Sequence, residues 1–249
     1  MLNKELILKN IGEIRQNIKR AVSSSNFAAA RSEVKIEPEV RIMAVTKSFP
    51  IEAVKIALDA GITLFGENRV QEAEEKFPQL KSASRYELHF IGHLQRNKAK
   101  KAVELFDMIQ SVDSFRLAKE LNAHAEQNNK KIPVLLQFNV ANEPSKTGFL
   151  LRDIDDIEER FEEYRYLDVQ GLMAIPPYYE DQQEVRPYFQ TMRELYKYFQ
   201  EQPVFFNSLK YLSMGMSHDY YQAVREGANI IRLGEALFGP RSKREAHNA

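Results

Sequence analysis

The sequence lacks cysteine: none occurs among its 249 residues. This excludes disulfides, thiolate metal ligands and cysteine nucleophiles, and it fits the reducing cytoplasm, where we expect the protein to act. Long apolar runs are also missing, since none approaches the roughly 18 residues of a membrane helix. The first twenty residues contain no continuous apolar stretch, so we expect neither a signal peptide nor a membrane span.

An excess of charge of either sign is absent as well. Lysine plus arginine and aspartate plus glutamate both number 35, which gives no general reason to bind nucleic acid or membrane. The short basic segment 96–101 is expected to be a solvated helix face. Hydrophobic residues at 43% and charged residues at 28% are typical of a globular protein.

Apolar segments alternate regularly with amphipathic ones. Strands are predicted at 40–46, 62–66, 88–92, 107–112, 133–140, 168–175, 209–215 and 229–234. Helices are predicted between them at 51–60, 68–77, 96–105, 114–129, 151–165, 182–201 and 217–227, with cap residues such as Ser114 at their starts and Gly61, Asn129 or Gly227 at their ends.

This alternation predicts an α/β fold with a parallel sheet. Eight units in about 200 residues favour a closed (β/α)8 TIM barrel over an open doubly wound sheet, and no glycine-rich nucleotide loop follows the first strand. We expect a single domain with the barrel at 40–240 and a polar tail at 241–249. Residues 1–39 form an N-terminal extension with an extra helix, because Ile7, Ile11, Ile14 and Ile18 follow a helical spacing.

In such a barrel the functional face is at the carboxyl ends of the strands. Lys47 ends the first strand, and Arg232 and Gly234 end the last. No cluster of histidine and carboxylate side chains has metal-ligand spacing, so we expect no metal site. Glycine-containing turns follow strands seven and eight, where backbone N–H groups and a helix N-terminus can bind phosphate; they could equally serve only as tight turns.

Strand parity places Lys47 and Arg232 in the barrel interior if Met43 and Gly234 face inward too. A buried amine and a buried guanidinium need partners. A phosphorylated aromatic aldehyde suits both, because its aldehyde reacts with the amine and its ring nitrogen accepts from the arginine. Pyridoxal 5'-phosphate is such a compound. The alternatives are a solvated lysine at a strand end and a structural ion pair of Arg232.

Eight segments together carry a family resemblance. They are AVTKSFP (44–50), FGENRVQE (65–72), HFIGHLQRNK (89–98), SVDS (111–114), NVANEPSKTGF (139–149), GLMAIP (171–176), SMGMSHDY (213–220) and IIRLGEALFG (230–239). In this order they resemble the pyridoxal phosphate homeostasis protein family, single barrels similar to the N-terminal domain of bacterial alanine racemase.

The resemblance implies cofactor-binding roles and no catalytic residue. Lys47 corresponds to the lysine that forms a Schiff base, and Arg232 lies beside the pyridine nitrogen. Ser217 and Gly234 are implicated in phosphate binding, and Asn68 and Met214 match positions near the cofactor. Glu235 departs from the serine or threonine common in the family. A carboxylate would repel a phosphate dianion, which leaves a side-chain role at that position open.

Two kinds of function compete: a pyridoxal phosphate enzyme such as an amino-acid racemase, and a protein that binds and buffers the cofactor. Alanine racemase uses a second, β-rich domain to complete its site, and this chain ends about ten residues after the last predicted strand. We therefore expect a cofactor-binding protein of vitamin B6 homeostasis without robust catalysis. Its expected partners are pyridoxal phosphate and, beyond it, apoenzymes or enzymes of B6 metabolism, with the chain acting as a monomer.

Other polar and aromatic residues are given structural roles. His89 is expected in the core and His93 at the barrel mouth. Tyr178, Tyr179 and the aromatic residues between 188 and 199 are expected to pack helices and not to line a cofactor site.

Overall fold

A computed structural model describes residues 3–34, 36–37, 39–80, 85–205 and 207–240. The strands form a closed barrel in sequence order, and every pair that it joins is parallel. They are β1 (Arg41–Val45), β2 (Leu64–Glu67), β3 (Glu87–Phe90), β4 (Met108–Val112), β5 (Ile132–Phe138), β6 (Leu167–Ala174), β7 (Tyr211–Ser213) and β8 (Ile230–Leu233). The predicted (β/α)8 barrel is confirmed.

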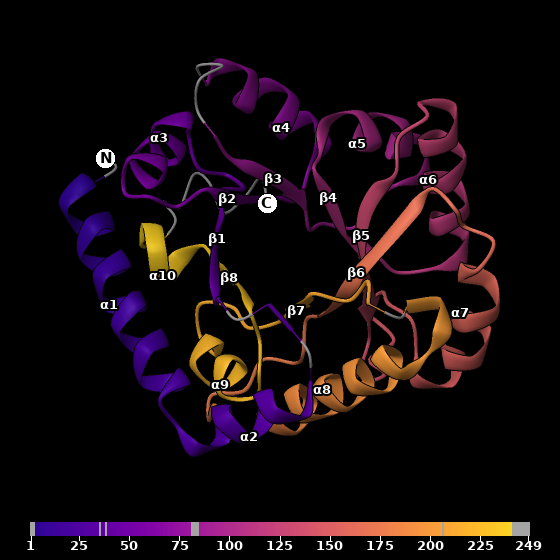
Figure 1. The fold of residues 1–249 in the computed structure, drawn as a ribbon. Helices are drawn as coiled ribbons and strands as arrows, with labels where there is room; N and C mark the ends of the chain where they lie inside the picture. The colour runs from indigo at the N-terminus through magenta and orange to yellow at the C-terminus, as the bar shows by residue number, and fades with distance from the viewer. Residues whose placement is uncertain (1–2, 35, 38, 81–84, 206, 241–249) are drawn as a thin grey trace.

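Helices form an outer ring around the strands (Figure 1). The α-helices are α1 (Lys4–Val22), α2 (Ser25–Glu33), α3 (Ile51–Asp59), α4 (Val70–Lys76), α5 (Ala99–Leu105), α6 (Phe115–Gln127), α7 (Ile154–Phe161), α8 (Arg186–Glu201), α9 (Tyr220–Arg225) and α10 (Glu235–Phe238). Short 3-10 turns are η1 (Phe77–Gln79), η2 (Arg96–Lys98), η3 (Leu151–Asp153) and η4 (Pro203–Phe205).

The main core lies between the barrel wall and this ring. Inside the barrel are two small apolar clusters, one of Met43, Leu64 and Ile230 and one of Met108, Leu135 and Met173. They come from opposite sides of the wall, and polar side chains occupy the space that they leave. The interior is therefore packed, as in other barrels of eight strands.

Helix α1 closes the ring where β8 meets β1. Its residues Ile7, Ile11 and Ile14 are buried, as their spacing predicts. Helix α10, which follows β8, has only four residues and is too short to cover this part of the wall. Side-chain hydrogen bonds attach α1: Asn10 donates to the Leu237 carbonyl at 3.1 Å, Asn17 to the Tyr220 hydroxyl at 2.8 Å and Arg15 to the Ala60 carbonyl at 3.1 Å.

The ends of several elements follow the predicted turn chemistry. Gly61, Asn129 and Gly227 have positive φ angles after α3, α6 and α9, where glycine and asparagine are favoured. Ser114 caps α6 by accepting from the Leu117 N–H. The tail 241–249 lies outside the described residues.

Several boundaries differ from the prediction, and two of them lie next to the loop between β7 and α9. Strand β7 has only three residues instead of seven, because the buried Asn229 side chain accepts from the Leu212 N–H and donates to the Lys210 carbonyl in place of a neighbouring strand. Helix α9 begins at Tyr220 and not at residue 217. The Met216 N–H donates to Asp219 Oδ1 and holds the preceding residues in a turn. Across the described part of the chain, no helix has the length and apolar character needed to cross a membrane.

Candidate functional site

A cavity of about 550 Å³ opens at the carboxyl ends of the strands. It brings together residues from the loops after seven of the strands and from the strand ends themselves. The polar side chains that line it are Lys47, Asn68, His93, Gln137, Asn139, Lys146, Thr147, Tyr178, Ser217, His218, Arg232 and Glu235. Among the described residues, no three histidine, cysteine or carboxylate side chains gather as a metal site would require.

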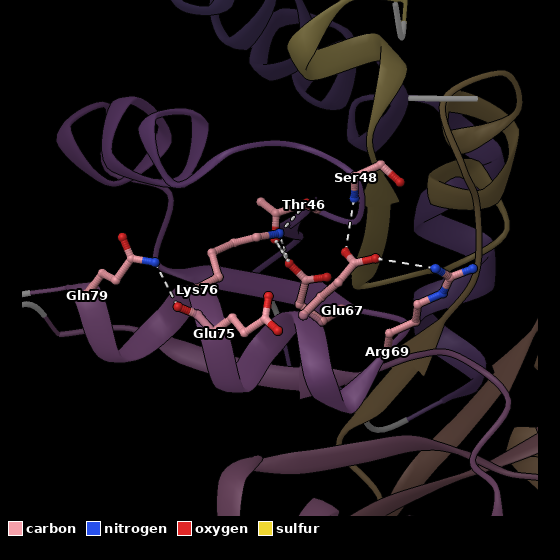
Figure 2. A network of polar contacts seen from close by, with 8 residues as sticks. Thr46, Ser48, Glu67, Arg69, Glu75, Lys76 and Gln79 are labelled. Atoms are coloured by element: carbon pink, nitrogen blue, oxygen red, sulfur yellow. Dashed lines mark hydrogen bonds and ion pairs between the residues drawn. The ribbon is translucent and has the colours of Figure 1, made fainter. Parts of the chain in front are cut away.

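Lys47 lines this cavity, and the residues on both sides of it are held by side chains from β2 and α4 (Figure 2). Thr46 donates its hydroxyl to Glu67 Oε1 at 2.6 Å, and the Lys76 ammonium donates to the Thr46 carbonyl at 2.8 Å. The Ser48 N–H donates to Glu72 Oε2 at 3.1 Å. Lys47 therefore projects from a short segment whose backbone is held before and after it.

The central pair of this network is buried. Glu67 is 0% exposed, and its Oε1 also accepts from Lys76 Nζ at 2.7 Å. Burial raises the pKa of Glu67 above its ordinary value, although the charge of Lys76 opposes that shift. A buried charge is tolerated only when it is paired and hydrogen-bonded, so the geometry of the Lys47 segment depends on this pair.

Arg232 enters the cavity from β8, and its side chain is only 4% exposed. It donates to Ser213 Oγ at 2.7 Å and to the Ala174 carbonyl at 2.8 Å. Burial lowers the pKa of Arg232 to about 10, and the field of Asp219 opposes the shift. The guanidinium therefore stays charged at neutral pH. Within the described chain it forms no ion pair with a carboxylate, so a ligand with acceptor atoms would complete its environment.

The loops after β7 and β8 meet at one end of the cavity. Gly215 has a φ of +93°, and a Cβ there would lie 2.5 Å from Ala223, so the turn requires glycine. Ser217 follows in this turn, and its Oγ accepts from the Ala236 N–H at 3.1 Å. A Cβ on Gly234 would meet protein atoms only at ordinary contact distances. The fold itself thus leaves room at Gly234, beside Ser217, for a ligand to approach the backbone.

The two remaining predicted positions, Asn68 and Met214, lie in different parts of the structure. Asn68 lines the cavity, and its Oδ1 is buried without a hydrogen-bond partner among the described residues. Met214 does not line the cavity: its side chain is fully buried in the main core outside the barrel, while Met216 two residues later reaches the site. The structure thus brings together Lys47, Asn68, Ser217, Arg232 and Gly234.

Several lining residues escape the sequence reasoning. Helix packing was expected for Tyr178, and this is wrong: its side chain is 72% exposed, lines the cavity and stacks on His218 with ring centroids 4.8 Å apart. The reason is that α8 begins at Arg186, four residues later than predicted, which leaves Tyr178 in a loop. Tyr179 does pack, donating or accepting at the Tyr188 hydroxyl.

The expectations for the two histidines of β3 and its loop agree with the structure. His89 is 1% exposed inside the barrel. His93 lines the mouth, and its Nδ1 lies 3.1 Å from Asp113 Oδ2. The signals for Gln137 and Lys146 are weak in the sequence: Gln137 lies on β5, and Lys146 reaches the cavity through the course of the loop after it.

These features fit a phosphorylated aromatic aldehyde. An amine at Lys47 and a buried guanidinium at Arg232 face one cavity. The unpartnered Asn68 Oδ1 can accept from a donor on such a ligand. The space beside Gly234 and Ser217 suits a phosphate. The side chain of Glu235 also lines the cavity, which adds a negative charge close to that end.

Comparison with known proteins gives a consistent result. A family model described as alanine racemase, N-terminal domain, matches residues 18–242. Proteins named pyridoxal phosphate homeostasis protein are similar along most of their length. That of Pasteurella multocida is 35% identical over 94% of this chain and 97% of its own, and that of Aquifex aeolicus is 40% identical over 81% and 87%.

A solved structure also resembles this one. PipY of Synechococcus elongatus PCC7942, determined with pyridoxal phosphate bound, superposes with a TM-score of 0.75 at 37% identity, covering 86% of this chain and 98% of PipY. The fold and the site define a barrel of the alanine racemase N-terminal type. Within that class, the chain belongs to the pyridoxal phosphate homeostasis protein family.

The buried pair beside Lys47 makes a stability prediction. Replacing Lys76 by methionine leaves the Thr46 carbonyl without its donor and the buried Glu67 carboxylate without its counter-charge, so that only the Thr46 hydroxyl still donates to it. We expect the free energy of unfolding in urea to fall by about 3 kcal/mol, as when a buried pair loses one partner.

A matched control is Lys101→Met. Lys101 also extends from a helix and pairs with Glu74 at 2.8 Å, but both side chains are largely solvent-accessible. We expect a loss below about 1 kcal/mol there. Equal losses in the two variants would contradict a special role for the Glu67–Lys76 pair.

Proposed function

We propose that this protein binds pyridoxal 5'-phosphate as a reversible Schiff base on Lys47 and acts in intracellular vitamin B6 homeostasis without robust catalysis. The observation that carries the proposal is the cavity itself. It places the amine of Lys47 and the buried charge of Arg232 on one site, with Ser217 and Gly234 at its edge. The names of the similar proteins and the pyridoxal phosphate bound to PipY support the same ligand.

Each residue has a definite role in holding the cofactor. The bound group supplies an aldehyde carbon that condenses reversibly with an amine. Lys47 provides that amine, which must be neutral to attack. Arg232 donates to the ring nitrogen, Asn68 accepts from a donor on the ring, and Ser217 and the backbone at Gly234 hold the phosphate. Met214 supports the β7 end of the site from the core behind it.

Arg232 supports the proposal of little turnover. A guanidinium at the ring nitrogen only donates, so it cannot supply a proton that would stay on that nitrogen. The ring is then a weaker electron sink, and chemistry that needs a stabilised carbanion is disfavoured. The protein acts as a monomer in the cytoplasm and passes the cofactor to apoenzymes or exchanges it with enzymes of B6 metabolism.

Covalent binding is tested by spectroscopy and labelling. Adding pyridoxal phosphate to the purified protein should produce the absorbance band of a Schiff base, and borohydride should then fix the label on Lys47, as mapped by mass spectrometry. Lys47→Ala should abolish the band. Lys146→Ala removes another lysine that lines the cavity and should retain it. Labelling only at other lysines would contradict the proposal.

Racemase, transaminase and decarboxylase assays test the lack of turnover. The loaded wild-type protein should convert amino acids no faster than free pyridoxal phosphate does, for the reason given for Arg232. The matched control is Lys47→Ala with the same amount of free cofactor. Wild-type turnover well above that control would favour the alternative, a pyridoxal phosphate enzyme such as a racemase.

The charge of Glu235 leads to a further prediction about cofactor affinity. Its carboxylate lines the cavity that is proposed to hold a phosphate dianion, so Glu235→Thr should tighten the binding of pyridoxal phosphate by about three- to ten-fold at low salt. The gain should shrink as salt rises, because the charge is exposed and screened. Fluorescence titration measures both effects.

The control is Glu104→Gln, which removes an exposed carboxylate on α5 outside the lining of the cavity. It should leave the affinity unchanged. Weaker binding by Glu235→Thr at low salt would show that the side chain helps to hold the phosphate.

A further inference from the structure

A chain of polar side chains crosses the barrel interior from the cavity to the opposite face. Arg232 donates to Ser213 Oγ at 2.7 Å, and Ser213 donates to Gln110 Oε1 at 2.7 Å. Gln110 Nε2 lies 2.9 Å from His89 Nδ1, and His89 Nε2 lies 3.4 Å from Glu87 Oε2. The step from Ser213 to Gln110 joins β7 to β4, which are not neighbours in the wall.

The chemistry of the two ends sets the direction of every hydrogen bond. A guanidinium only donates, so Ser213 must accept from Arg232 and has its own proton for Gln110. The amide nitrogen of Gln110 then donates to His89, whose Nδ1 must be unprotonated. The remaining proton of a neutral His89 is on Nε2 and points to the Glu87 carboxylate, which can only accept.

The reverse orientation of Gln110 fails on the same grounds. It would point the amide N–H at Ser213, whose oxygen already accepts from Arg232, and leave the serine proton without an acceptor. His89 would then carry its proton on Nδ1 and turn the lone pair of Nε2 toward the Glu87 carboxylate, which is repulsive. Only one arrangement satisfies all the buried groups.

The surroundings of His89 keep it neutral. Burial lowers its pKa below the ordinary value, and Arg41 acts in the same direction, while Glu87 and Asp107 oppose the shift. Glu87 is anchored in turn by Arg41, whose Nη2 donates to Oε1 at 2.7 Å. His89 and Arg41 together lower the pKa of Glu87 to about 2, so the carboxylate stays charged.

We infer that Ser213, Gln110, His89 and Glu87 are positioning residues that fix the Arg232 guanidinium for the ring of the cofactor. The inference rests on the proposed function, because the ring nitrogen is the group that Arg232 would meet. This series of hydrogen-bonded side chains is not a proton relay into the cavity, because the group at its cavity end is a guanidinium, which does not accept a proton. Its effect is to hold one orientation of Arg232 from the far face of the barrel.

The effect on ligand binding is tested by removing a single hydroxyl group from this series of side chains. Ser213→Ala deletes one of the two acceptors of Arg232 and should weaken pyridoxal phosphate binding by about five- to ten-fold, the order of a hydrogen bond to a charged group. Ser111→Ala is the matched control: this serine is also 0% exposed, but its hydroxyl has no partner among the described residues. It should bind as the wild type does. Equal affinities in the two variants would overturn the inference.

A second pair of variants acts at the far end, where Glu87 is half-exposed and does not line the cavity. Glu87→Met removes the last acceptor and should also weaken binding, whereas Glu87→Gln keeps an acceptor and should restore most of the affinity. A simple packing role would not distinguish the two. Thermal melting identifies any variant that fails to fold, in which case Ser213→Ala decides.

Nitrogen NMR of the cofactor-free protein separates this inference from the proposed function. The His89 signals, assigned by their loss in His89→Gln, should show a neutral ring with its proton on Nε2. A proton on Nδ1 would overturn the hydrogen-bond chain. The wild-type protein could instead show the expected His89 signals and yet take up no pyridoxal phosphate. That result would overturn the proposed function, and with it the role of these side chains in positioning Arg232 for a cofactor.

Discussion

The buried charge of Arg232 is the constraint on which the interior of this barrel depends. A guanidinium that is 4% exposed loses most of its hydration, and such a loss is tolerable only when its donors find acceptors. Ser213 and the Ala174 carbonyl provide two of them, and neither carries a charge. The guanidinium has further N–H donors, and acceptors for them can come from a ligand in the cavity. The interior of the protein is therefore built for a ligand with acceptor atoms.

A second polar network holds the segment that follows β1, the strand next to β8. The Lys47 segment is held by Glu67, Lys76 and Glu72, all from β2 and α4. The two networks come from different strands and share no residue. One holds the backbone on both sides of Lys47, and the other holds the Arg232 guanidinium, so side chains of strands and of α4 support both positions. Support of this kind keeps the groups of a site in place.

The ligand end at β7 and β8 has a different character. There the backbone turns at Gly215 after β7 and at Gly234 after β8. The Ser217 hydroxyl joins the two loops by accepting from the Ala236 N–H, and no buried cation takes part in this contact. The exposed Glu235 adds negative charge beside them. Such an end can hold an anion through backbone groups, which agrees with the proposed exchange of the cofactor.

The sequence was sufficient to predict the barrel, because eight apolar segments separated by amphipathic ones leave few other arrangements. The apolar segments also placed Lys47, Arg232 and Gly234 at strand ends, and strand parity placed their side chains or backbone on the inner face. The resemblance added Asn68 and Ser217, which the cavity brings together, and Met214, which lies in the core behind it. Tyr178 was missed because its position depends on where α8 begins, and His218 because α9 begins later than predicted and leaves it in a turn.

What the sequence by itself determined is local: the order of strands and helices, the turn residues and the face on which each strand side chain lies. What only the tertiary structure decided is pairing across the barrel. Ser213 and Gln110 are 103 residues apart, and nothing near either one identifies its partner. Glu67 and Lys76 are close in the chain, yet their burial depends on the packing of α4 over β2. Closure of the sheet creates these contacts, because only a closed wall brings non-neighbouring strands within reach of one hydrogen bond.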